Sequence, residues 1–162
     1  MSDFSDWLRG FRDLHERARR GGLKEGEEST YLAARDELAR AMVAAQRLSL
    51  KPGEKARHKL RVARALQLDL EIAGKYQRTV TLDLSAGGFS TVMAMPPGLG
   101  ESMGVTLRLP AAESLACRAR VTDVKPQDGS ARVAAAFISL PPADLERLER
   151  FIIDAVLAML AG

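Results

Sequence analysis

The chain has 162 residues, 46% of them hydrophobic, and a net charge of +3, so it is long enough for one domain with its own core plus a smaller appended segment. With one cysteine and two histidines, an internal disulfide is excluded and a metal site is not expected. No apolar run reaches the roughly 18 to 20 residues of a membrane-spanning helix, and the first residues are acidic, unlike a secretory leader. We therefore expect a cytoplasmic protein without a metal or cofactor and without membrane contact.

The first fifty residues predict a helical hairpin. Apolar residues recur at spacings of three and four and predict a helix over residues 3–20, which Gly21 and Gly22 end. A second helix is predicted over residues 25–48, with an apolar seam at Tyr31, Leu38, Met42 and Ala45. We expect Trp7, Phe11 and Tyr31 in the hairpin core and His15 on its polar face. Because two helices bury little, the hairpin should also pack on the downstream domain or form a homodimer through its helices.

The positive charge is concentrated in a basic linker over residues 51–64. This segment holds six Lys or Arg against Glu54 alone, a net charge of +5, whereas residues 1–50 carry nine charges of each sign. Such a local strip indicates a local anionic partner. The sequence Lys51-Pro52-Gly53 breaks the helical pattern. We therefore divide the chain into a hairpin over 1–50, the linker over 51–64, and a third part over 65–162.

In the third part, residues 65–72 and 79–84 alternate apolar and polar residues with a period of two, which is typical of strands. Strands are predicted over residues 65–72, 79–84, 89–93, 105–109, 115–124 and 132–138, with a hairpin turn over 125–130 and Cys117 in the core. Six short strands at this spacing predict an antiparallel β-barrel. A last helix, over residues 143–160, is apolar nearly all round and should be covered on more than one side. The expected fold class is α+β.

Two polar clusters predict a nucleotide site. In the linker, Arg57 and Arg61 offer planar guanidinium groups suited to phosphates and purine faces. In the segment Asp83-Leu84-Ser85-Ala86-Gly87-Gly88, at a strand end, Asp83 supplies an acceptor carboxylate and Ser85 a small hydroxyl, while glycine lets backbone approach a ligand. His58, Lys59, Arg64 and Gly87 are possible accessory contacts.

These residues resemble the PilZ domain, a small bacterial receptor for cyclic di-GMP, over about residues 55–155. The family's RxxxR motif is matched by Arg57 and Arg61, and its [D/N]xSxxG motif by Asp83, Ser85 and Gly88. The resemblance implies a PilZ-type barrel with a C-terminal helix that binds cyclic di-GMP. It implies that the arginines contact phosphates and guanine faces, that Asp83 accepts from a guanine edge, and that Ser85 and the Gly88 backbone complete the site. Where many relatives have a glycine before Phe137, this chain has Val133-Ala134-Ala135-Ala136.

Other interpretations stay open at this point. The linker arginines alone would most often be a solvated charge run, and the Asp83 segment alone a turn. A nucleic-acid binder could use the basic linker, but no row of aromatic residues accompanies it, which argues against this class. A degenerate PilZ module that binds only protein is a further alternative. No P-loop and no set of nucleophile and base is present, so an enzyme is not expected.

The order of the segments also predicts a switch. The linker joins the hairpin to the barrel in the sequence, so a ligand held by Arg57 and Arg61 against Asp83 and Ser85 would fix the orientation of the hairpin. The output would be contact with an effector protein, which the sequence does not identify, or a change in self-association.

Overall fold

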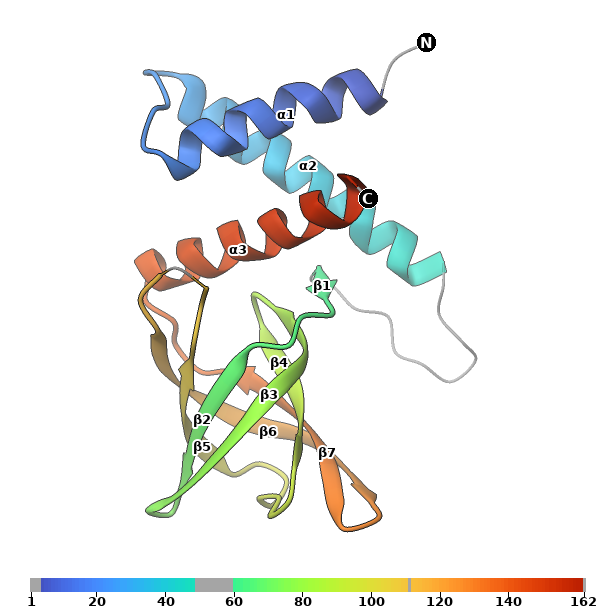
Figure 1. Cartoon of the computed structure of the whole chain (residues 1–162), viewed down its shortest axis with the longest axis vertical. Coiled ribbons are helices and arrows are strands. Elements are labelled where there is room, and N and C mark those ends of the chain that lie inside the picture. Colours follow the sequence, from blue (N-terminus) through green and yellow to red (C-terminus); the bar gives the residue numbers. More distant parts are fainter. Residues whose placement is uncertain (1–3, 49–59, 111, 162) are drawn as a thin grey trace. The chain divides into compact units, whose positions relative to one another are not determined.

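The computed structural model describes residues 4–48, 60–110 and 112–161 (Figure 1). The chain divides into two compact units, one with residues 1–60 and 156–162, the other with residues 61–155. The predicted boundaries at residues 50 and 64 remain a prediction, because residues 49–59 lie outside the described ranges. Each unit is described separately below.

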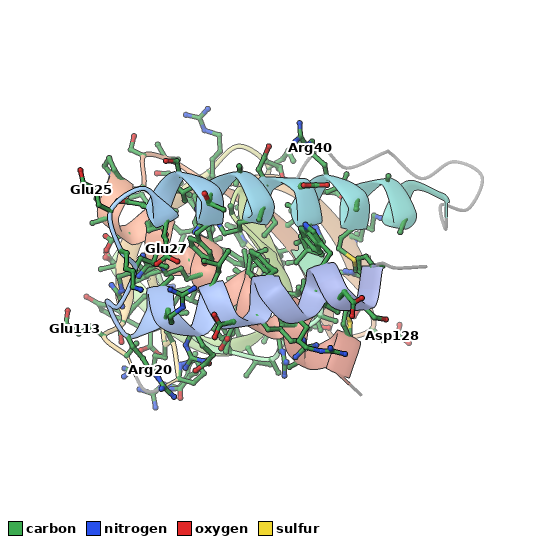
Figure 2. The ribbon with its side chains drawn as sticks, turned by 90° about the horizontal axis from the view of Figure 1, so that it is seen from above. Arg20, Glu25, Glu27, Arg40, Glu113 and Asp128 are labelled. Atoms are coloured by element: carbon green, nitrogen blue, oxygen red, sulfur yellow. The ribbon has the colours of Figure 1, made fainter. Side chains whose placement is uncertain are left out.

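The first unit contains an antiparallel helical hairpin, as predicted. Helix α1 spans Phe4–Arg19 and helix α2 spans Glu27–Leu48, and the two lie side by side (Figure 2). Gly21, with φ of 72°, follows α1, and the Gly22 N–H donates to the Arg17 carbonyl over 2.7 Å. This left-handed residue closes the last turn of α1, which is why the glycine pair ends the helix.

The hairpin core is built on stacked rings. The Phe11 ring stacks on the rings of Trp7 and Tyr31, with centroids 5.6 and 5.8 Å apart. The expectation for His15 was wrong: its side chain is buried, and its Nδ1 lies 2.8 Å from the Tyr31 hydroxyl. A buried polar ring is tolerated when it is hydrogen-bonded, and the Tyr31 hydroxyl supplies that partner.

The predicted seam of α2 holds over most of its length. Tyr31 and Leu38 are buried and Met42 is half-buried, but Ala45 is exposed, so its place in the seam was wrong. Helix α2 has 22 residues and α1 only 16. The last turns of α2 therefore extend past the start of α1, where Phe4 is itself 56% exposed.

The second unit is a closed antiparallel barrel of six strands, β2 to β7. Neighbouring strands in the ring follow the order β3-β2-β5-β6-β7-β4, and a β3–β4 pairing closes it. The strands span Gln67–Ile72 (β2), Lys75–Ser85 (β3), Gly88–Met93 (β4), Ser102–Leu107 (β5), Leu115–Gln127 (β6) and Ser130–Phe137 (β7). Alternate residues point inward and bury a core that includes Leu68, Leu84, Phe89 and Val133. The sequence prediction of the barrel is confirmed.

A seventh short strand, β1, was not predicted. It spans Arg61–Val62, inside the predicted linker, and pairs antiparallel with the end of β3, Arg61 opposite Ser85 and Val62 opposite Leu84. Val62 is buried and so anchors this strand to the barrel. The basic segment is therefore part of the sheet at Arg61 and Val62.

The β6–β7 hairpin is longer than predicted. Only Asp128 and Gly129 form its turn, because Gln127 pairs with Ser130 and Pro126 with Ala131. Ladder hydrogen bonds alternate along an antiparallel pair, so Pro126 lies at a position whose missing N–H faces away from β7. The pairing of β5 with β6 has already ended at Arg120, so no strand on that side needs this donor.

Helix α3 spans Pro142–Ala161 and belongs to both units, since the division falls between Ala155 and Val156. Proline at the first helical position lacks an N–H that would have no helical partner there. Buried side chains lie on more than one side of the helix, as expected: Leu148, Ile152, Ile153, Ala155, Val156 and Leu157. None of the described helices is long and apolar enough to cross a membrane.

Candidate functional site

Strand β1 places Arg61 beside the Asp83 segment. The Arg61 Nη1 lies 2.5 Å from the Asp83 Oδ1, and the two side chains are 25% and 14% exposed. Because Arg61 is paired with Ser85 across the two strands, its side chain points to the same outer face of the barrel as Ser85. The second arginine of RxxxR and the carboxylate of DxSxxG therefore meet at one place.

Ser85 organises the turn that follows β3. Its Oγ accepts a hydrogen bond from the Gly87 N–H over 3.1 Å and lies 3.5 Å from the Gly88 carbonyl oxygen. The Gly87 carbonyl in turn accepts from the Phe137 N–H over 2.9 Å. The hydroxyl is buried, so its first role is to shape the hairpin between β3 and β4.

Gly88 is required by the barrel itself. It pairs with Ala136 of β7, and a Cβ at position 88 would overlap the Ala135 carbonyl oxygen and lie 3.0 Å from the Ala136 Cα. Only glycine lets the two strands approach this closely. The glycine of the motif thus brings the Asp83 hairpin tight against β7.

The register of the strands places small side chains together on one outer face of the barrel, which we call the small-residue face. Side chains of directly paired residues point to the same side, so the floor beyond Asp83 is formed by Ser85, Gly88, Ser90, Ala134 and Ala136. Ser90 is buried, and its Oγ makes no hydrogen bond to any residue that the structure describes. Ser85, Gly88 and Ser90 are buried and Ala134 and Ala136 are half-buried, so this face carries no long side chain of its own.

Two further arginines border the small-residue face and were missed by the sequence analysis. Arg120 of β6 is paired with Ala136, and Arg132 of β7 places its Nη2 3.5 Å from the Asp83 Oδ2. Both are exposed. Only the strand register could reveal them, since they lie 37 and 49 residues from Asp83 in the sequence. With Arg61, they surround the face with cations suited to an anionic ligand.

The remaining predicted contact residues are Arg57, His58, Lys59 and Arg64. Arg57, His58 and Lys59 lie outside the described residues, and their part in the site remains a prediction. Arg64 has an exposed side chain, and its carbonyl accepts a hydrogen bond from the Thr81 hydroxyl. Within the described ranges, no three or more His, Cys, Asp or Glu side chains are grouped so that they could hold a metal ion.

The comparison with known families decides the membership of the chain. The PilZ domain matches residues 55–154, which include the whole barrel and both motifs. The chain belongs to the PilZ domain family. Its helical hairpin precedes the matched region. A search of curated proteins finds no match.

Solved structures of PilZ proteins share the fold. The Bacillus subtilis inhibitor of motility MotI (DgrA) is 22% identical with a TM-score of 0.57, covering 67% of this chain and 57% of its own. YcgR of Escherichia coli in complex with c-di-GMP is 15% identical with a TM-score of 0.58. The match covers 66% of this chain and 49% of YcgR. The K. pneumonia MrkH–c-di-GMP complex is 16% identical with a TM-score of 0.58. The match covers 67% of this chain and 56% of MrkH. The matched part thus spans about half the length of these proteins.

Proposed function

We propose that this protein is a cytoplasmic, non-enzymatic receptor for cyclic di-GMP. The observation that carries the proposal is the meeting of Arg61 with Asp83 at the edge of the small-residue face. YcgR and MrkH, which share the fold, are named as complexes with c-di-GMP. Their similarity supports the fold, and the residues of this chain supply the argument for the ligand.

The roles of the residues follow from the chemistry of the ligand. Cyclic di-GMP has two phosphodiesters and two guanines, so it needs cations, flat contacts and an acceptor for the guanine N–H groups. Arg61 and Arg57 would bind the phosphates and stack on guanine. Asp83 would accept from a guanine edge, with Ser85 and the Gly88 backbone beside it. Accessory contacts would come from His58, Lys59, Arg64 and Gly87.

The small-residue face supports this assignment physically. A guanine laid over the half-buried Ala134 and Ala136 would face methyl groups, while Arg61, Arg120 and Arg132 stand at the borders. A hydrogen bond to a charged group contributes about 1.5 to 3 kcal/mol net. A few such bonds are sufficient for a dissociation constant in the micromolar range or below.

The proposed output is a change in the helical hairpin. Arg57 lies in the sequence between α2 and β1, so a ligand bound to Arg57 and Arg61 would fix the path of residues 51–64 and with it the orientation of the hairpin. The hairpin would then contact an effector protein or a second copy of the chain. Hydrogen–deuterium exchange of residues 51–64, with and without cyclic di-GMP, tests this step. Identical exchange in the two states would exclude it.

Isothermal titration calorimetry tests the ligand. Cyclic di-GMP, GMP and a short DNA duplex are titrated separately into the full chain. We expect saturable heat with cyclic di-GMP, a much weaker signal with GMP, and no tight binding of the duplex. Absence of heat with cyclic di-GMP would favour a PilZ module that binds only protein. Tight duplex binding with a steep salt dependence would instead indicate a nucleic-acid binder.

A further inference from the structure

Asp83 lies between two arginines that come from opposite directions along the barrel wall. Arg61 of β1 approaches its Oδ1 at 2.5 Å, and Arg132 of β7 approaches its Oδ2 at 3.5 Å. The carboxylate is mostly covered, with 14% of the side chain exposed, whereas Arg132 is 46% exposed. Each oxygen of Asp83 therefore has its own cation.

This arrangement matters because Arg61 has two tasks under the proposed function, on which this inference rests. In the structure Arg61 is paired with Asp83, but a bound phosphate would draw the same guanidinium away. A mostly covered carboxylate that loses its close cation is destabilised. It could then no longer be held in a fixed direction toward a guanine edge.

We propose that Arg132 is a positioning residue of the ligand site, which holds Asp83 when Arg61 turns to the ligand. Arg132 is anchored in β7 opposite Val92, on the same outer face as Asp83. Its Nη2 contacts the Asp83 Oδ2, the oxygen that Arg61 does not contact. The outward residues between them, Ser90 and Val92, carry no charge. Lys125, opposite Arg132, instead lies 3.8 Å from Asp123.

The barrel offers a matched control for this proposal. Asp69 of β2 also lies between two arginines, Arg78 at 3.0 Å and Arg108 at 2.7 Å. Arg108 is 49% exposed, close to the 46% of Arg132. Removing Arg108 thus deletes a similarly exposed arginine from another aspartate that lies between two arginines, and this pair is closer than the one between Arg132 and Asp83.

The test compares cyclic di-GMP titrations of Arg132→Ala and Arg108→Ala with those of the unaltered chain. We expect Arg132→Ala to weaken binding about three- to fivefold, the size typical of a partly exposed ion pair. Arg108→Ala should leave affinity unchanged, and Arg132→Lys, which keeps the charge, should recover most of it. Equal affinities for the unaltered chain and both alanine variants would overturn the proposal.

A double-mutant cycle separates positioning from direct contact. If Arg132 acts through Asp83, then Arg132→Ala should have no further effect in an Asp83→Asn background. The same three- to fivefold loss in that background would show that Arg132 contacts the ligand itself and would overturn the positioning role. If the unaltered chain binds no cyclic di-GMP, the proposed function fails first, and the inference fails with it.

Discussion

Arg61 and Asp83 form an ion pair of 2.5 Å that joins the two halves of the candidate site. They are 22 residues apart in the sequence, and the pairing of β1 with β3 brings them together. Each half by itself has an ordinary structural explanation. The contact between them is what makes a single anion-binding and acceptor-bearing site the better interpretation.

The Asp83 carboxylate should be essential for affinity. Asp83→Asn keeps the shape of the side chain but removes the negative charge, so it weakens both the acceptor for guanine and the hold on Arg61 and Arg132. We expect cyclic di-GMP binding to weaken about tenfold, equivalent to about 1.4 kcal/mol. Calorimetric titration measures the change, with Asp69→Asn on the neighbouring strand β2, paired with Arg78 and Arg108, as the control. An unaltered dissociation constant for Asp83→Asn would remove this residue from the site.

Gly88→Ala should destabilise the barrel rather than act only on the ligand. The added methyl group would overlap the Ala135 carbonyl oxygen, and backbone atoms cannot move aside cheaply. Overpacking of this kind costs about 1 to 3 kcal/mol. Urea denaturation provides the free energy of unfolding. Gly98→Ala is the control, because there the nearest atom to the new Cβ is 3.5 Å away on the Glu101 side chain. Equal stability of the two variants would contradict the close approach of β4 and β7.

Glu27 should stabilise the hairpin only while it is ionised. Hydrogen bonds from the Lys24 N–H and from Arg17 lower its pKa below the ordinary value of 4.5; the carboxylate lies between the two helices (Figure 2). A lowered pKa in the folded state means that the stabilisation is present above pH 4.5 and is lost as the pH falls through the folded pKa.

Thermal unfolding followed by circular dichroism checks this pH dependence. Glu27→Gln should lower the Tm at about pH 6, and the difference from the unaltered chain should shrink toward about pH 3. Glu28→Gln, exposed in the same helical turn, serves as the control. A Tm difference for Glu27→Gln that stays constant over this range would mean that the charge of Glu27 contributes nothing.

Cys117 should react slowly with thiol reagents. Burial, with a smaller contribution from the charge of Asp144, raises the pKa of the thiol to about 11 from an ordinary value of 9.0. At pH 8 the reactive thiolate is then about a hundredfold rarer than in an ordinary cysteine. Reaction with Ellman's reagent should accelerate up to about pH 11 in the folded chain but level off near pH 9 in urea. The same pH profile in both states would contradict the raised pKa.

The sequence predicted the elements whose patterns are long and regular. The alternation in β2 and β3 and the three-to-four spacing in α1 gave the right element types, because each has one buried and one exposed side. Strand β1 was missed because a strand of two residues is too short to show the alternation of apolar and polar residues. His15 was misplaced because helical spacing alone does not show that a polar ring can be buried beside a hydroxyl such as that of Tyr31.

The site was predictable only in part for a related reason. Arg61, Asp83 and Ser85 lie in short motifs, so their spacing could be read from the sequence. Arg120 and Arg132 lie on strands whose outward residues are commonly charged, and nothing in the local sequence sets them apart. Their place at the border of the small-residue face depends on the Gly88 approach and on the order of β4, β7 and β6 in the ring.

Titration of the unaltered chain and Arg61→Ala with cyclic di-GMP tests whether Arg61 binds the ligand, with Arg78→Ala as an exposed arginine control outside the site. We expect saturable binding to the unaltered chain and to Arg78→Ala, and a ten- to hundredfold loss for Arg61→Ala, about the contribution of one charged hydrogen bond. Binding of equal strength by Arg61→Ala, or no binding by the unaltered chain, would contradict this expectation.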